Sequence, residues 1–198
     1  LYGRDSFTIT TPKSRDHTEI MLKEFGCNIT LESDSIYVIP SKLTSPKTID
    51  IPGDISSAAF FIVGSIISKD SQVKIENVGL NPLRTGFIDI LKMMGATIEI
   101  SDLKTVNGEL VGNIDVESSS LEGITIPKEL IASSIDELPL IILAASQAEG
   151  KTSLRNAEEL RFKESDRISS MVKMMERFNI SIDEFNDGMD VHGGIIKG

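Results

Sequence analysis

The segment VKIENV at residues 73–78 returns as TSLRNA at residues 152–157, and the stretches that follow the two copies also match. The first copy precedes IDILKMM at residues 88–94, and the second precedes a stretch of the same apolar pattern at residues 168–175. The two copies lie about 80 residues apart, which is typical of a duplicated supersecondary unit. A partial third copy at the front of the chain leads the middle copy by about 69 residues, so that Arg15 corresponds to Arg84.

Each full copy has the pattern strand, helix, strand, helix, strand, strand. The first strands are predicted at residues 48–52 and 123–127, both of which alternate in polarity and end in proline. The helices that follow, at residues 58–67 and 138–145, are apolar nearly all round, which predicts burial on every side. The second helix of each unit is amphipathic and should be half exposed. This combination predicts an α/β (α+β) fold with helices inside and sheets outside.

A polar stretch with a proline, residues 41–47, separates the front half-unit from the two full units. We therefore predict that residues 1–46 form the last, partial repeat of one domain. Residues 47–198 are predicted to form two βαβαββ repeats of a second domain. Because the chain opens at Leu1 and not at methionine, we expect it to be a piece of a longer protein.

Charge and composition exclude several classes of protein. The formal net charge is −10, whereas nucleic acids and anionic membrane surfaces require a basic face. No apolar run is long enough to span a membrane and no signal peptide is recognisable, so we expect a cytoplasmic protein. Cys27 is the single cysteine, which excludes an internal disulfide and a zinc site built with the two distant histidines. We expect Cys27 to be a small buried residue, and His17 and His192 to be surface or capping residues.

Charged side chains gather before the last amphipathic helix, in EELRFKESDR at residues 158–167. Lys163 and Arg167 lie near the predicted helix start, where cations oppose the helix dipole. They are costly there unless an anionic ligand or a neighbouring acid such as Glu164 offsets them. A solvated charge run is the alternative explanation of the same pattern.

Asp136 lies at the start of the last enclosed helix. Ser134 and Glu137 have the spacing of a capping box, which would make Asp136 the second helical residue. One explanation is an acid that stabilises the helix dipole in the first turn. The other is a carboxylate that a rigid, buried helix delivers into a cleft. The matching entrance of the middle unit, residues 53–59, can likewise be a structural cap or a ligand contact.

Five motifs, in order, span almost the whole chain. Together they resemble the bacterial EPSP synthase (3-phosphoshikimate 1-carboxyvinyltransferase) family: SRDHTE at 14–19, PGDISSAAF at 52–60, NPLRTG at 81–86, IDELP at 135–139 and ELRFKESDR at 159–167. The resemblance implies an enolpyruvate transferase-like inverse α/β barrel, in two domains of three repeated units each. The repeats described above agree with that fold.

The resemblance also implies a reaction of the shikimate pathway of aromatic amino acid biosynthesis. The 5-hydroxyl of shikimate 3-phosphate attacks phosphoenolpyruvate and phosphate leaves, with neither a metal nor an organic cofactor. By motif match, Asp136 is the base toward the 5-hydroxyl, Lys163 contacts the substrates at the reacting centre, and Glu164 shuttles a proton at the methyl carbon.

The same match implies which residues bind the two substrates. Arg167 binds phosphoenolpyruvate, and Ser14 and Arg15 hold the 3-phosphate of shikimate 3-phosphate. Asp136 and Lys163 contact substrate as well. Both substrates are polyanions, so converging cations must offset their repulsion and hold them in attack geometry. The resemblance implies a monomeric parent protein whose partners are these two small molecules.

This sequence departs from the family pattern in two respects. The family's N-terminal Lys-Ser-Arg segment, its Ser-Ser/Ala-Gln motif and its later arginine and lysine segments are missing, so we expect this piece alone to be inactive. Glu159 stands where some members carry a substrate-binding asparagine. Two other interpretations are open: a UDP-N-acetylglucosamine enolpyruvyl transferase, or a non-catalytic anion-binding scaffold fragment.

Overall fold

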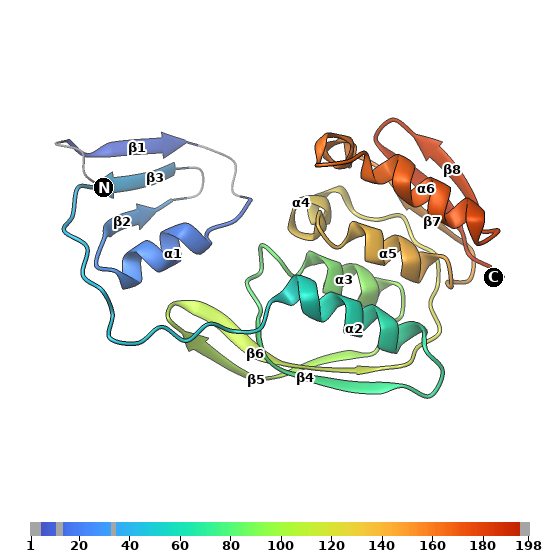
Figure 1. Ribbon diagram of the computed structural model, residues 1–198, viewed down its shortest axis with the longest axis horizontal. Helices are drawn as coiled ribbons and strands as arrows, with labels where there is room; N and C mark the ends of the chain where they lie inside the picture. The colour runs from blue at the N-terminus through green and yellow to red at the C-terminus, as the bar shows by residue number, and fades with distance from the viewer. Residues whose placement is uncertain (1–4, 11–13, 33–34, 195–198) are drawn as a thin grey trace.

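The computed structural model describes residues 5–10, 14–32 and 35–194, which form two lobes (Figure 1). The N-terminal lobe contains β1 (Phe7–Thr10), α1 (His17–Glu24), β2 (Asn28–Leu31) and β3 (Ser35–Ile39). Its antiparallel sheet has the order β1-β3-β2, and α1 packs against β2. A small core of its own is formed by Cys27, Ile29, Ile36 and Val38, so the expected burial of Cys27 is confirmed. The division at residues 46 and 47 into two domains stays a prediction.

The C-terminal lobe begins with the middle unit. This unit contains α2 (Ile55–Ile67), β4 (Gln72–Gly79), α3 (Gly86–Met93), β5 (Ile98–Val106) and β6 (Glu109–Glu117). The three strands form an antiparallel sheet in the order β4-β6-β5. Helix α2 starts where it does because the Asp54 side chain accepts hydrogen bonds from the amides of Ser56 and Ser57, which lack helical partners.

The last unit repeats this arrangement with a broken first helix. It contains η1 (Lys128–Leu130), α4 (Ile131–Ser134), α5 (Leu138–Ala145), β7 (Lys151–Leu154), η2 (Glu158–Phe162), α6 (Arg167–Arg177), β8 (Ser181–Phe185) and β9 (Gly188–His192). Its sheet has the order β7-β9-β8, as in the middle unit. The repeat extends to the backbone, since Asn77 and Asn156 occupy matching positions and both have φ near +60°: 57° and 58°. Asparagine tolerates that left-handed conformation better than most residues.

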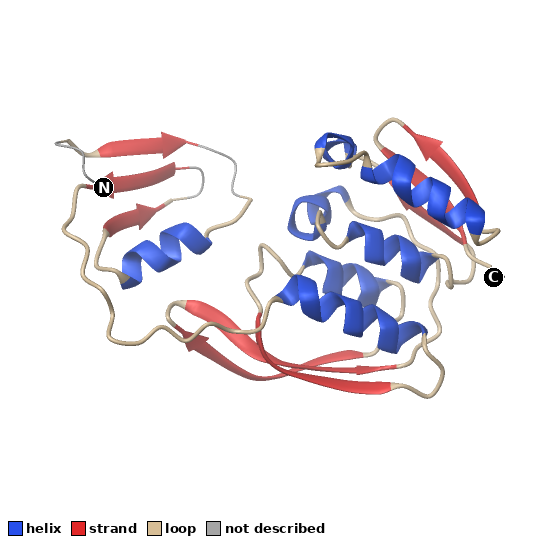
Figure 2. Cartoon of the chain, viewed as in Figure 1, coloured by secondary structure: helices blue, strands red, loops and turns tan. Residues whose placement is uncertain are grey.

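The helices of the C-terminal lobe lie between its two sheets (Figure 2). Helix α2 packs on β4 and β6 and also on α5, while α5 and α6 pack on the strands of the last unit. One continuous apolar core joins the two units, with side chains such as Phe87, Ile142 and Met175 fully enclosed. The fold prediction of helices inside and sheets outside is therefore confirmed. No helix in the described ranges is both long and apolar enough to span a membrane.

Two details of the sequence-based expectation are wrong. Residues 48–52 and 123–127 are not regular strands. The only pairing at or next to them consists of the isolated parallel bridges Gly53↔Val78, Glu122↔Glu149 and Thr125↔Ser153. The bridge of the first segment lies just past its end, at Gly53, and Ile51 stays exposed. Helix α2 is also not enclosed all round, since Phe60 and Phe61 are each 66% exposed. Apolar composition predicts burial, but it does not say which element covers each face.

Candidate active site

Asp136 lies in the turn between α4 and α5. The predicted capping box is not formed, because the Ser134 hydroxyl donates to the Leu130 carbonyl within its own helix. Glu137 is the N-cap of α5, and Pro139 lies in the first turn, where its missing N–H costs nothing. Asp136 therefore lies one residue before the N-cap and two before Leu138, the first helical residue, and not at the second helical position. Its side chain is 27% exposed.

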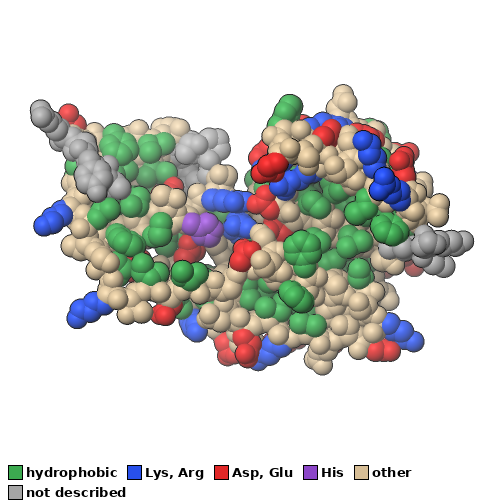
Figure 3. Space-filling view, viewed as in Figure 1, with side chains coloured by type: hydrophobic (Ala, Val, Ile, Leu, Met, Phe, Trp, Pro, Cys, Tyr) green, Lys and Arg blue, Asp and Glu red, His purple; other side chains and the backbone are tan. Residues whose placement is uncertain are grey.

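Cations from both lobes meet at the Asp136 carboxylate. Oδ2 forms an ion pair with the Arg15 guanidinium of the N-terminal lobe, and Oδ1 lies 3.8 Å from Arg167 Nη1. Arg167 Nη2 in turn donates to Glu164 Oε2 at 3.2 Å. Figure 3 shows a notch between the lobes where basic and acidic side chains gather at the floor. Positive and negative side chains thus alternate across the junction. An anionic ligand can take the place of one of the acids in its contact with an arginine.

Arg167 begins α6, and the acids that contact it are Glu164 at 3.2 Å and Asp136 at 3.8 Å. Asp166 is the N-cap, and its side chain accepts from the Ser169 amide. That hydrogen bond and the Arg161 guanidinium lower the pKa of Asp166, although desolvation opposes them. The neighbouring acids therefore offset the predicted cost of a cation in the first helical turn.

Lys163 follows η2 and lies four residues before α6, outside that helix. Its Nζ is 3.0 Å from Glu159 Oε1. Across the described ranges of the chain, no ion pair joins Lys163 to Asp136. The structure thus brings Asp136, Arg15, Arg167 and Glu164 into one chain of contacts and places Lys163 in a separate pair beside it.

Glu164 is the most exposed acid of this chain of contacts, with 86% of its side chain accessible. A hydrogen bond to its own backbone amide and the contact with Arg167 lower its pKa. In this arrangement Glu164 is held as a carboxylate. Ser14, the remaining residue from the motif match, lies in an exposed bend immediately before Arg15.

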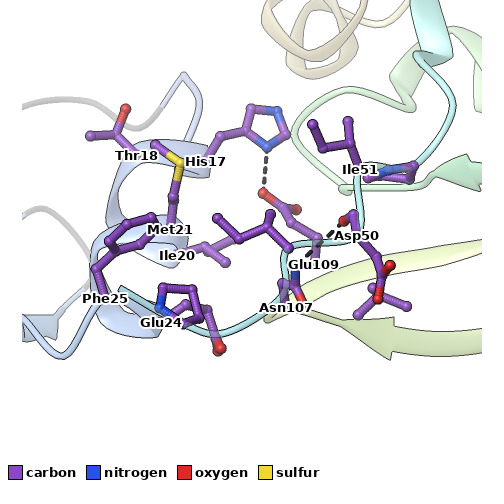
Figure 4. Close-up of a pocket in the computed structure, with 14 residues that line it drawn as sticks. His17, Thr18, Ile20, Met21, Glu24, Phe25, Asp50, Ile51, Asn107 and Glu109 are labelled. Atoms are coloured by element: carbon purple, nitrogen blue, oxygen red, sulfur yellow. Dashed lines mark hydrogen bonds and ion pairs between the residues drawn. The ribbon is translucent and has the colours of Figure 1, made fainter. Parts of the chain in front are cut away.

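A polar junction between the lobes was not foreseen from the sequence. The buried Asn81 amide donates to Asp16 Oδ1 at 2.7 Å and to Glu109 Oε2 at 3.1 Å. His17 Nδ1 lies 2.5 Å from Glu109 Oε1, and Figure 4 shows the ring turned toward that carboxylate. His17 is a partly exposed residue at the start of α1, as expected, but its contact with Glu109 was not predicted. Asn81 belongs to the NPLRTG motif, and Asp16 and His17 belong to the SRDHTE motif, so these two motifs are the sequence signals that could have indicated the contact.

A cavity of about 230 Å³ lies beside this junction (Figure 4). Its wall comes from α1, from the segment that connects the lobes, and from the β5–β6 turn, with Ile20, Met21 and Ile49 among the apolar lining residues. The lobes therefore touch through a few polar contacts around an unfilled apolar space. Such a junction is less tightly packed than a domain core.

A second unforeseen cluster is buried between the two units of the C-terminal lobe. Arg84 Nη2 donates to Ser56 Oγ at 2.6 Å, and that hydroxyl donates to Glu137 Oε1 at 2.5 Å. Arg84 and Glu137 are 3.7 Å apart, and their side chains are 15% and 2% exposed. Burial raises the pKa of Glu137, although Ser56 and Arg84 oppose that effect. Arg84 aligns with Arg15 in the repeat, and this correspondence was the sequence signal that could have indicated a structural or functional role for Arg84.

Comparison with known proteins agrees with this architecture. The EPSP synthase (3-phosphoshikimate 1-carboxyvinyltransferase) family model matches residues 5–198. The 3-phosphoshikimate 1-carboxyvinyltransferase of Caldicellulosiruptor bescii is 51% identical over 187 residues, which cover 92% of this chain and 43% of that protein. That of Petrotoga mobilis is 47% identical over 196 residues, which cover 98% of this chain and 45% of that protein.

Solved structures give the same result. The EPSP synthase of Acinetobacter baumannii superposes with a TM-score of 0.92 at 40% identity, over 98% of this chain and 44% of that one. The enolpyruvyl transferase NikO of Streptomyces tendae has a TM-score of 0.70 at 15% identity, over 96% of this chain and 43% of that one, and shares the fold alone. The chain spans less than half the length of the curated relatives it matches. It belongs to the EPSP synthase (3-phosphoshikimate 1-carboxyvinyltransferase) family.

Proposed function

We propose that the full-length protein carrying this chain transfers the enolpyruvyl group of phosphoenolpyruvate to the 5-hydroxyl of shikimate 3-phosphate and releases phosphate. The observation that carries the proposal is the Asp136 carboxylate, which meets Arg15 from one lobe and Arg167 from the other. The names of the relatives support the same reaction. Two polyanionic substrates need such converging cations to overcome their mutual repulsion.

Asp136 accepts the proton of the 5-hydroxyl as its oxygen attacks carbon 2 of phosphoenolpyruvate. The substrate anions displace the acids that pair with the cations in this structure, and Arg15 then holds the 3-phosphate together with Ser14. Arg167 holds phosphoenolpyruvate. Displacement costs little because ion pairs between partly exposed side chains contribute only ~0–1 kcal/mol.

Carbon 3 of the enol gains a proton as the carbon–oxygen bond forms and loses one as phosphate leaves carbon 2. We assign this proton to Glu164 and the stabilisation of the developing charge to Lys163. The lowered pKa of Glu164 depends on its backbone amide and on Arg167. When phosphoenolpyruvate occupies Arg167, Glu164 loses one of these two partners and becomes a better proton carrier.

We further propose that the 198 residues alone do not catalyse the reaction. The active site also needs cationic residues from family motifs that these 198 residues do not contain. The reaction uses neither a metal nor an organic cofactor. We place the full-length protein in the cytoplasm as a monomer whose partners are the two small substrates, without nucleic acid or membrane.

Phosphate release by the full-length protein, measured with both substrates, tests the proposal. Asp136→Asn or Lys163→Met should lower kcat by orders of magnitude, whereas Asp183→Asn on strand β8 should not. Titration of the 198-residue chain with shikimate 3-phosphate, followed by NMR, should shift the amides of Ser14, Arg15 and Lys163. Near-normal kinetics in the first two variants would overturn the assignments, and an absence of anion binding would indicate a scaffold.

A further inference from the structure

The buried cluster of Arg84, Ser56 and Glu137 connects three separate elements. Ser56 belongs to the first turn of α2, Arg84 to the turn before α3, and Glu137 to the start of α5. The hydroxyl of Ser56 stands between the guanidinium and the carboxylate, with donor–acceptor distances of 2.6 and 2.5 Å. Because Glu137 is 2% exposed, water does not replace these partners.

Main-chain contacts transmit the position of Glu137 to Asp136. The Glu137 carbonyl accepts the amides of Leu140 and Ile141, so this residue starts α5. On the other side of the turn, Gly86 of α3 lies so close to α4 that an added Cβ would overlap the Ser133 side chain. The Asp136 turn is thus confined from the middle unit at both ends.

Two residues of the cluster stand at positions of the repeat whose counterparts in the neighbouring copies are proposed to contact substrate. Ser56 lies one repeat length before Asp136, and Arg84 corresponds to Arg15. In the middle unit, however, Arg84 is 15% exposed, and it is paired with Glu137, which belongs to the last unit. A second substrate site at this place is therefore excluded by burial and by neutralisation.

Glu137 stands between two groups of opposite charge. Asp136 is its neighbour in the chain and already meets Arg15 and Arg167, while Arg84 faces Glu137 from the other side. Asp54, at the start of α2, is the further acid whose charge interacts with Arg84. Without the Glu137 charge, the Arg84 guanidinium would be largely buried without its ion-pair partner, which is costly. We expect it to turn toward a remaining acid, so that it competes for the Asp136 carboxylate.

We propose that Glu137 is a positioning residue, which holds Arg84 and thereby leaves the Asp136 carboxylate to Arg15, Arg167 and the substrate. This inference rests on the proposed function for its effect on turnover. Its effect on the geometry at Asp136 does not depend on that function. What matters is that Glu137 neutralises the Arg84 charge, and not that its side chain fills space.

The test compares Glu137→Gln, Arg84→Met and the double variant in the full-length protein. Glu137→Gln should lower kcat by about tenfold to a hundredfold, because a displaced catalytic group costs that much. KM for shikimate 3-phosphate should stay within about threefold. The double variant, which removes both buried charges, should regain most of the lost kcat and be at least as stable as the original protein. Asp190→Asn, at another buried carboxylate–arginine pair, is the matched control and should leave kcat unchanged.

A second readout separates this inference from the transferase assignment. In the 198-residue chain, NMR hydrogen exchange of the Arg15 guanidinium reports its ion pair with Asp136. Exchange should become faster in Glu137→Gln and slow again in the double variant, whether or not the protein is a transferase. If Glu137→Gln does not fold, Ser56→Ala provides the smaller perturbation and should lower kcat severalfold. Unchanged kcat and exchange in folded Glu137→Gln, or a double variant no better than the single one, would overturn the proposal.

Discussion

Asp136 forms an ion pair with Arg15, which lies 121 residues earlier in the chain and in the other lobe. The contact joins the α4–α5 turn to the segment that precedes α1. Both side chains are partly exposed, so water screens the pair and its net contribution to stability is only ~0–1 kcal/mol. A weak, exchangeable contact is suited to a cation that must release an internal acid when an anionic ligand arrives.

Replacement of Arg15 should weaken the binding of shikimate 3-phosphate. Arg15→Gln removes charge-assisted hydrogen bonds, each of which contributes roughly 1.5–3 kcal/mol, so KM should rise by about tenfold to a hundredfold. Steady-state kinetics of the full-length protein provide the measurement. Lys23→Gln, in the last turn of α1 in the same lobe, is the control. Equal changes of KM in the two variants would mean that Arg15 contributes only to the overall charge of the lobe and does not contact the substrate.

Neutralisation of Glu159 should strengthen anion binding at Lys163. The Glu159 carboxylate lies 3.0 Å from Lys163 Nζ and competes with any anionic ligand for it. Because ion pairs between partly exposed side chains contribute only ~0–1 kcal/mol, Glu159→Gln should lower the dissociation constant of shikimate 3-phosphate only about twofold at low salt. Calorimetric titration at two salt concentrations measures this effect. Glu158→Gln, one residue earlier, should change the constant less, and a weaker binding of the Glu159 variant would contradict the competition.

Asp190 should make the protein sensitive to acid. Burial alone would raise the pKa of its carboxyl, but the ion contacts with Arg155 at 2.8 Å and Lys151 at 3.0 Å outweigh burial and lower the pKa from 3.8 to about 2. A carboxyl whose pKa is lowered by folding stabilises the folded state at pH values above its ordinary pKa. This contribution is lost as the pH falls from about 4 to about 2. The shift corresponds to about 2 kcal/mol of unfolding free energy.

Urea unfolding at pH 7 and at pH 3 measures the Asp190 contribution. Asp190→Asn should be less stable than the original protein by about 2 kcal/mol or more at pH 7, and the difference should shrink at pH 3. Asp183→Asn removes an exposed carboxylate from the same sheet and should cost little at either pH. A constant difference at both pH values would show that the charge of Asp190 is not what stabilises the sheet.

Two glycines should respond oppositely to alanine. An added Cβ at Gly86 would overlap the Ser133 side chain, so Gly86→Ala should destabilise the protein by about 1–3 kcal/mol. Gly64, inside α2, has open space where a Cβ would stand, so Gly64→Ala should stabilise the helix by about 0.5–1 kcal/mol. Thermal unfolding measures both effects. Ser133→Ala added to Gly86→Ala should recover part of the loss, and failure to do so would place the strain elsewhere.

An extra charge at the junction of the lobes should loosen it. Asn81→Asp would place a third carboxylate between Asp16 and Glu109, whose oxygens now accept from the Asn81 amide. The resulting repulsion should expose the connecting residues 40–47 and speed their cleavage by a protease several-fold. Limited proteolysis measures the rate. Asn179→Asp, at an exposed position with left-handed backbone, is the control, and equal rates would mean that the junction does not depend on Asn81.

Local patterns in the sequence determined much of the fold. The repeated units, the helices between sheets and the burial of α5 follow from apolar periodicity, because each helix must turn its apolar face to a core. The charged motif before α6 was also readable from residue order alone, whereas the role of Asp166 as the N-cap of that helix was not predicted. Periodicity did not resolve residues 48–52, whose alternation suggested a strand, although the nearest bridge to a neighbouring strand lies at Gly53.

Only the tertiary structure decided which charges meet. Arg15 reaches Asp136 from the other lobe, Lys163 pairs with Glu159 and not with Asp136, and Glu137 lies buried against the middle unit. Motifs identified the chemical groups, but ion pairs between distant segments depend on how helices and lobes are placed relative to one another. That placement arises from core packing over the whole chain, and a few ångströms decide whether two charges interact strongly or are separated by water.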